Sequence, residues 1–214
     1  MPIEDALAAV LSDKSRLGQI LIQRKSPAGF AVCHLDDANT DGLKVFQKPE
    51  DALEIARYDD KGKYRPLKTA PNLRHGWKLE IADPVGLRRA LDHIYPGRLA
   101  ALAARMENQL RTTSLRETLD RQSGMYRVAA KIADEQIDQV VADFCKSDGG
   151  CLRTILWDRD RDGATASAKL PASKFDPAYD QTGYGETAIP LLCQEACGLL
   201  VNECRKAVKG ETGE

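Results

Sequence analysis

The spacing of hydrophobic residues in the first part of the chain predicts a small domain that mixes helices with strands. Apolar runs typical of strands occur at residues 17–22, 29–35, 43–46 and 77–81. The first two are expected to pair as a hairpin across Ser26–Gly29. Helices are expected at residues 2–12, 49–57 and 83–94, and residues 58–75 are expected to form an ordered loop.

Beyond Tyr95 the pattern becomes mainly helical. Helices are predicted from Pro96 to about Leu110, from a capping box at Ser114, at residues 125–133 and from Asp134 to Cys145. A buried strand at 151–157, a long polar loop at 158–187 and a helix from Pro190 to about Val208 complete the chain. The predicted fold class is α+β, with a small N-terminal α/β domain of antiparallel strands at residues 1–95 and a mainly helical domain at residues 96–214.

Composition excludes several classes of function. The chain has 214 residues, and its 31 Lys and Arg against 32 Asp and Glu leave a net charge of -1. No global positive field exists to gather nucleic acid or an anionic membrane. No apolar stretch is long enough to span a bilayer, and the acidic N-terminus does not resemble a secretory signal, so we expect a cytoplasmic protein.

The cysteines are the strongest candidates for chemistry. Four of the six form two close pairs, Cys145 with Cys151 and Cys193 with Cys197. On the predicted final helix the second pair is spaced i, i+4, which places both thiols on one face. A reducing compartment keeps thiolates available for metals, and all three histidines lie in the first half of the chain, so an all-cysteine site is expected.

The pairs could hold zinc or an iron-sulfur cluster, and the alternative is that the cysteines are small core residues. Structural zinc sites favour C-x2-4-C knuckles, whereas Cys145 and Cys151 are spaced C-x5-C, and this gives the cluster a modest advantage. Cys204 would lie roughly 16 Å from Cys193 along a continuous helix and is expected to be a spectator. Cys33 is expected to be a core residue of a strand. The Asp-rich run 158–163 is expected to be a solvated turn and not a calcium loop.

Several motifs are similar to those of a known family. Arg121–Arg127, Cys151–Arg153 with Trp157, and Ile189–Cys197 resemble the 4Fe-4S cluster-binding domain found fused to some CbiX-type sirohydrochlorin cobaltochelatases, the DR2241-like family. Tyr64–Trp77 and Ile94–Pro96 resemble the stabilising domain of that family. The resemblance implies that Cys145, Cys151, Cys193 and Cys197 ligate a 4Fe-4S cluster. It also implies that Arg121, Tyr126 and Arg153 supply hydrogen bonds or positive charge near it.

The chain has no room for a chelatase domain, so metal insertion is not expected of this polypeptide. We expect a non-catalytic redox or accessory protein with a link to tetrapyrrole metal insertion, whose partner is a chelatase or a redox enzyme. A redox or iron sensor and a structural zinc protein with four cysteine ligands are the alternatives. An enzyme is disfavoured because no catalytic triad, Walker loop or dinucleotide-binding turn occurs.

Overall fold

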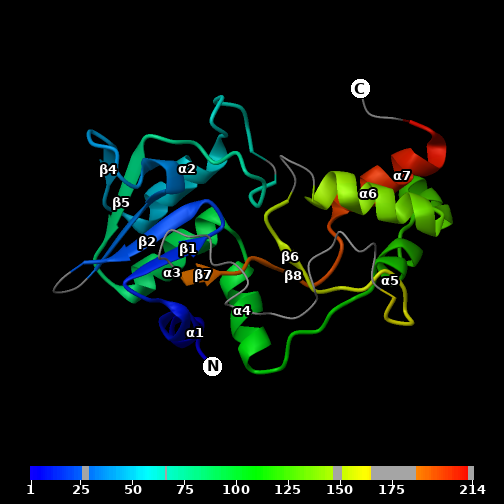
Figure 1. Ribbon diagram of the computed structural model, residues 1–214, viewed down its shortest axis with the longest axis horizontal. Helices are drawn as coiled ribbons and strands as arrows, with labels where there is room; N and C mark the ends of the chain where they lie inside the picture. The colour runs from blue at the N-terminus through cyan, green and yellow to red at the C-terminus, as the bar shows by residue number, and fades with distance from the viewer. Residues whose placement is uncertain (26–28, 66, 147–150, 165–186, 212–214) are drawn as a thin grey trace. The chain divides into compact units, whose positions relative to one another are not determined.

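The computed structural model describes residues 1–25, 29–65, 67–146, 151–164 and 187–211 (Figure 1). The chain divides into two compact units. Among described residues, the first unit comprises 1–109 and 187–191, and the second comprises 110–164 and 192–211. A six-stranded sheet combined with helices confirms the mixed α and β content of the predicted fold class.

The first unit is built on a six-stranded sheet with the strand order β4-β5-β3-β2-β1-β7. The strands are β1 (Lys14–Leu17), β2 (Ile20–Arg24), β3 (Phe30–His34), β4 (Lys44–Phe46), β5 (Trp77–Ile81) and β7 (Thr187–Ile189). The inner pairs are antiparallel, as predicted, and β2 and β3 form the expected hairpin. The edge strands β4 and β7 instead pair in parallel with β5 and β1, so the sheet is mixed.

The prediction of one continuous strand at residues 17–22 is wrong, because the chain reverses direction within this segment. Gly18 has a φ of +58°, a left-handed conformation that costs other residues energy, and it separates β1 from β2. A Cβ atom on Gly18 would lie 2.7 Å from the Tyr95 hydroxyl oxygen. That oxygen accepts a 2.9 Å hydrogen bond from the Gln19 amide, which fixes the turn. The apolar run Leu17–Ile22 therefore belongs to two strands.

Helices pack on this sheet and supply much of its core. They are α1 (Ile3–Val10), η1 (Leu35–Asp37), η2 (Pro49–Asp51), α2 (Ala52–Arg57), α3 (Pro84–Ile94) and α4 (Arg98–Met106). The Asp83 carboxylate caps α3 by accepting the Gly86 amide at 2.8 Å, as the sequence predicts. The next helix ends at Met106, earlier than predicted, because Asn108 takes a left-handed φ of +55° that ends the helical conformation.

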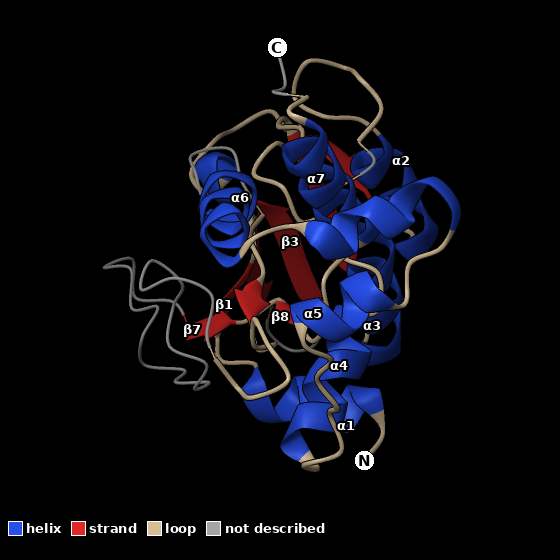
Figure 2. Ribbon diagram, turned by 90° about the vertical axis from the view of Figure 1, so that its right-hand side faces the viewer, coloured by secondary structure: helices blue, strands red, loops and turns tan. Residues whose placement is uncertain are grey.

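The second unit is mostly helical with one small parallel sheet. Its elements are α5 (Leu115–Asp120), η3 (Gly124–Lys131), α6 (Asp134–Lys146), β6 (Thr154–Ile155), β8 (Leu192–Cys193) and α7 (Gly198–Lys209). The capping box predicted at Ser114 and Glu117 is present, and the segment predicted as a short helix at residues 125–133 is a 3-10 helix. Helices α6 and α7 pack against each other (Figures 1 and 2).

Two predictions for this unit are wrong. The buried strand expected at 151–157 is only two residues long, and the final helix begins at Gly198, not at Pro190. The reason is that Leu192 and Cys193 pair with Thr154 and Ile155 in parallel, so this part of the chain is extended. Most of the polar loop predicted at 158–187 lies outside the described residues.

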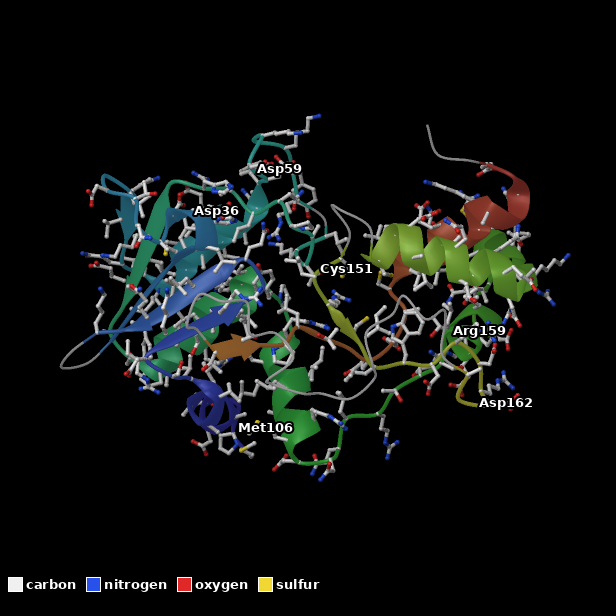
Figure 3. All side chains as sticks on the ribbon, viewed as in Figure 1. Asp36, Asp59, Met106, Cys151, Arg159 and Asp162 are labelled. Atoms are coloured by element: carbon white, nitrogen blue, oxygen red, sulfur yellow. The ribbon has the colours of Figure 1, made fainter. Side chains whose placement is uncertain are left out.

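The Asp-rich run after Trp157 forms a turn stabilised by ion pairs (Figure 3). Arg159 pairs with Asp160 at 2.9 Å and with Asp138 of α6 at 3.5 Å, and Arg161 pairs with Asp120 at 3.0 Å. Arginines of the run are therefore engaged by acidic groups within and around it. In the described part of the chain, no helix is long and apolar enough to cross a membrane.

Candidate metal centre

Four separate segments of the second unit carry the paired cysteines. Cys145 is buried near the end of α6, and Cys151 is half-buried in the segment that leads into β6 (Figure 3). Cys193 is buried at the end of β8, and Cys197 is half-buried immediately before α7. No disulfide joins any of the six cysteines of the chain. All four candidate thiols thus belong to one compact unit.

One hydrophobic core brings these segments together. Cys145 and Cys193 are both members of the buried cluster that also contains Ile155 and Trp157, and Cys197 packs against it. The pairing of β6 with β8 sets Ile155 opposite Cys193. Cys151 shortly precedes β6 in the chain, so it is also close to this pairing. Cys151 is close enough to Cys193 to affect its ionisation electrostatically. Three of the four cysteines therefore border one core, and Cys151 lies near Cys193.

The thiol of Cys193 has the most defined surroundings. Its sulfur accepts a 3.3 Å hydrogen bond from the Trp157 indole N–H and donates one to the Glu195 carbonyl at 3.2 Å. Burial raises the pKa of Cys193, while hydrogen bonds from Trp157 and Arg153 and the Arg153 charge oppose that rise. A thiolate there has a tryptophan donor and a cation in place and needs a metal to offset its desolvation.

Cys197 occupies a different position from the one predicted. The i, i+4 arrangement on a helix is wrong, because Cys193 is in a strand and Cys197 is the N-cap residue of α7. At the start of this 12-residue helix the first backbone amides have no partner within the helix, and the helix dipole favours a negative charge. The helical spacing in the sequence did not suggest this N-cap position.

The described cysteine sulfurs do not form a ready-made zinc site. Four thiolates at the usual zinc–sulfur distance of about 2.3 Å in a tetrahedron lie about 3.8 Å apart. Among the described residues, no three cysteine sulfurs lie within 4.8 Å of one another. A soft, thiolate-rich donor set is also the one that binds a polynuclear iron-sulfur group. The residues present therefore fit such a group.

Of the remaining cysteines, Cys204 is a core residue and Cys33 is half-buried, less buried than predicted. Cys204 is fully buried two turns into α7, and burial raises its pKa to about 12. Cys33 lies in β3 of the first unit, which confirms the strand that was predicted for it. Burial also raises the pKa of the Cys33 thiol. The large shift disfavours Cys204 as a thiolate ligand, and Cys33 belongs to the other unit.

The other motif residues differ in how they relate to the cysteines. Arg153 interacts directly with Cys193, whereas the exposed Arg121 pairs with Glu195 at 3.8 Å. Tyr126 lies under the Arg205 guanidinium, 5.8 Å from its carbon to the ring centroid. Sequence reasoning gave no role to Trp157, whose indole reaches Cys193. Its place in the cysteine-containing motif, two residues after Ile155, was the sequence feature that could have indicated such a role.

Two family models match consecutive parts of the chain. Residues 4–106 match the DR2241 stabilising domain, and residues 107–206 match a 4Fe-4S iron-sulfur cluster binding domain. These matches define a protein that carries a 4Fe-4S cluster on one domain beside a stabilising domain. Together the two matches cover residues 4–206 and confirm the resemblance to the DR2241-like family that the motifs implied.

A solved structure has the same arrangement of elements. The crystal structure of DR2241 from Deinococcus radiodurans superposes with a TM-score of 0.73 at 26% sequence identity, covering 98% of this chain and 41% of that one. DR2241 is described as a multi-domain protein with structural similarity to chelatases and with two additional novel domains. This chain therefore spans less than half the length of that relative. No curated protein matches the chain.

Proposed function

We propose that Cys145, Cys151, Cys193 and Cys197 ligate the 4Fe-4S cluster, and that the protein has a non-catalytic redox or accessory role. The observation that carries this proposal is the surroundings of Cys193, whose buried sulfur receives the Trp157 N–H at 3.3 Å beside Arg153. Cys145 and Cys197 pack on the same core, and Cys151 acts on Cys193. When bound, the cluster supplies one-electron chemistry.

The number of proposed ligands favours electron transfer over catalysis. Four cysteines provide one thiolate for each of four irons, which leaves no open position for a substrate. The Trp157 and Arg153 donors place positive charge and N–H groups beside Cys193, and such groups favour the more negative, reduced form of the centre. These residues therefore tune a redox centre and do not bind a reactant.

An exposed part of the second unit supports docking to another protein. Arg121 and Arg127 are exposed, as are the large side chains of Met125 and Tyr126 between them. Methionine, aromatic residues and arginine are enriched in protein interfaces, and arginines attract an acidic partner even when the net charge is balanced. We propose that the partner is a chelatase or a redox enzyme, with acidic residues at its docking site.

The proposed link to tetrapyrrole metal insertion rests on the similarity of this chain to DR2241. DR2241 is a multi-domain protein with structural similarity to chelatases, and this chain matches only part of it. We propose that the cluster-binding chain acts beside a separate chelatase in the cytoplasm. Metal insertion itself then belongs to the partner.

Electron paramagnetic resonance of the anaerobically purified protein tests this function. We expect a reversible one-electron reduction whose signal does not change when sirohydrochlorin or other small ligands are added, because every iron already has a thiolate. Direct binding of a ligand to a unique iron would contradict the proposal. So would metal insertion into sirohydrochlorin by the purified chain alone.

Replacing Trp157 with phenylalanine should lower the reduction potential of the cluster. The substitution keeps an aromatic ring in the core but removes the N–H that is donated to the Cys193 sulfur, and such hydrogen bonds stabilise the reduced cluster. Potentiometric titration measures the shift. Trp77→Phe is the matched control, because Trp77 is also buried and donates its N–H to the Arg74 carbonyl in the first unit. Equal potentials in Trp157→Phe and the unaltered protein would show that this bond does not tune the centre.

A further inference from the structure

The first unit contains a group of three side chains that could bind a metal, and none of them is a cysteine. His34, Asp36 and His75 each offer a ligand atom, and these three atoms lie within 4.8 Å of one another. The Nδ1 atom of His34 and a carboxylate oxygen of Asp36 are 3.7 Å apart. Two ligands of one ion, each about 2.1 Å from it, can be no more than about 4.2 Å apart. Since Nδ1 of His34 already accepts the Asp36 amide, the free ligand atom of this ring is Nε2, and the exposed Asp36 and His75 side chains must adjust to reach an ion there.

The imidazole of His34 is the rigid part of the group. It is 2% exposed and its ring centroid lies 3.9 Å from that of His75. Its Nδ1 atom accepts the Asp36 amide at 3.1 Å, while its Nε2 atom is buried with no hydrogen-bond partner in the described structure. A buried polar ring that the protein satisfies incompletely is costly.

The backbone holds His75 beside His34. The Asp37 carboxylate accepts the Gly76 amide at 2.7 Å, and the Gly76 carbonyl accepts the Lys44 amide at 3.1 Å. Pairing of β3 with β5 aligns the segments that carry the two histidines. The other oxygen of Asp37 lies 4.0 Å from Nδ1 of His75, which is longer than a hydrogen bond.

We propose that His34, Asp36 and His75 form a second metal site, independent of the cluster, that takes one divalent transition-metal ion. Two imidazoles and one carboxylate are the donor set of borderline ions such as Co²⁺, Ni²⁺ and Zn²⁺, whereas Mg²⁺ and Ca²⁺ prefer oxygen ligands. His75 is 43% exposed and Asp36 is 75% exposed, so both can adjust around an ion held by the buried His34 (Figure 3 labels Asp36). Three protein ligands leave further positions to water, and the bound ion is exchangeable.

Isothermal titration of the cluster-loaded protein with Co²⁺ tests this site. We expect one ion per chain, and we expect His75→Ala and Asp36→Asn each to weaken binding by at least about 10-fold, since each removes one ligand. Both side chains are exposed enough that their replacement should leave the fold intact. His93→Ala is the matched control, because His93 lies on α3 outside this group and should leave the affinity unchanged.

Absence of Co²⁺ binding would overturn the site, and so would equal affinities in the unaltered protein, His75→Ala and Asp36→Asn. Iron and sulfide content measured in the same samples keeps the result separate from the cluster. If a protein sample has less cluster but binds Co²⁺ with unchanged affinity, the result bears on the cysteine ligands and not on the histidine site.

Discussion

Serine in place of any one of Cys145, Cys151, Cys193 or Cys197 should abolish or strongly deplete the brown chromophore of the anaerobically purified protein. Each substitution removes one of four thiolates, and a serine hydroxyl is a much poorer ligand for iron because it stays protonated near neutral pH. We expect the largest loss for Cys193, since its sulfur is buried and already receives the Trp157 N–H. Visible absorption and iron content measure the effect.

Cys33→Ser and Cys204→Ser are the matched controls, and both should retain the chromophore. Cys33 lies in the other unit, and Cys204 is a buried core thiol of α7. A bleached Cys204→Ser protein together with an intact Cys197→Ser protein would show that the ligand set is wrong.

Removing the iron should loosen the second unit before the first. The four candidate ligands lie on separate segments, so without a cluster the ordering of those segments depends on a small core and a two-stranded sheet. We expect the amides of α6 and α7 to exchange hydrogen at least about 10-fold faster in the apo protein. Hydrogen exchange measured by mass spectrometry checks this.

The sheet of the first unit provides the internal reference for that experiment. Its strands β2, β3 and β5 are largely buried and contain none of the four candidate cluster ligands, so their protection should not depend on the cluster. Unchanged exchange of α6 and α7 on iron removal would mean that the cluster has no structural role.

Local signals in the sequence predicted those elements whose causes are local. Asp83 and Ser114 cap helices because their side chains reach amides three residues away, and this spacing is visible in the chain. The apolar stripe from Ile137 to Cys145 likewise shows the buried face of α6.

Elements that depend on distant partners were missed. Gly18 reverses the chain where the phenol of Tyr95 packs against it, and nothing near Gly18 in sequence indicates that contact. The segment before Cys193 is extended because it pairs with β6, so a run that reads as the start of a helix is a strand. Long-range pairing overrode local preference in both cases.

The candidate cysteine site likewise combines features that the sequence indicates with features that depend on distant contacts. Grouping of the cysteines suggested a four-thiolate site, whereas the Trp157 donor at Cys193 and the N-cap position of Cys197 needed the structure. The histidine group was missed altogether, because His34 and His75 are distant in sequence and meet only through the pairing of β3 with β5.

Iron and acid-labile sulfide analysis of the anaerobically purified chain, with zinc measured in the same sample, tests the central claim most directly. We predict about four irons and four sulfides per chain, as a 4Fe-4S cluster held by four cysteines requires. One zinc per chain with no sulfide would contradict it.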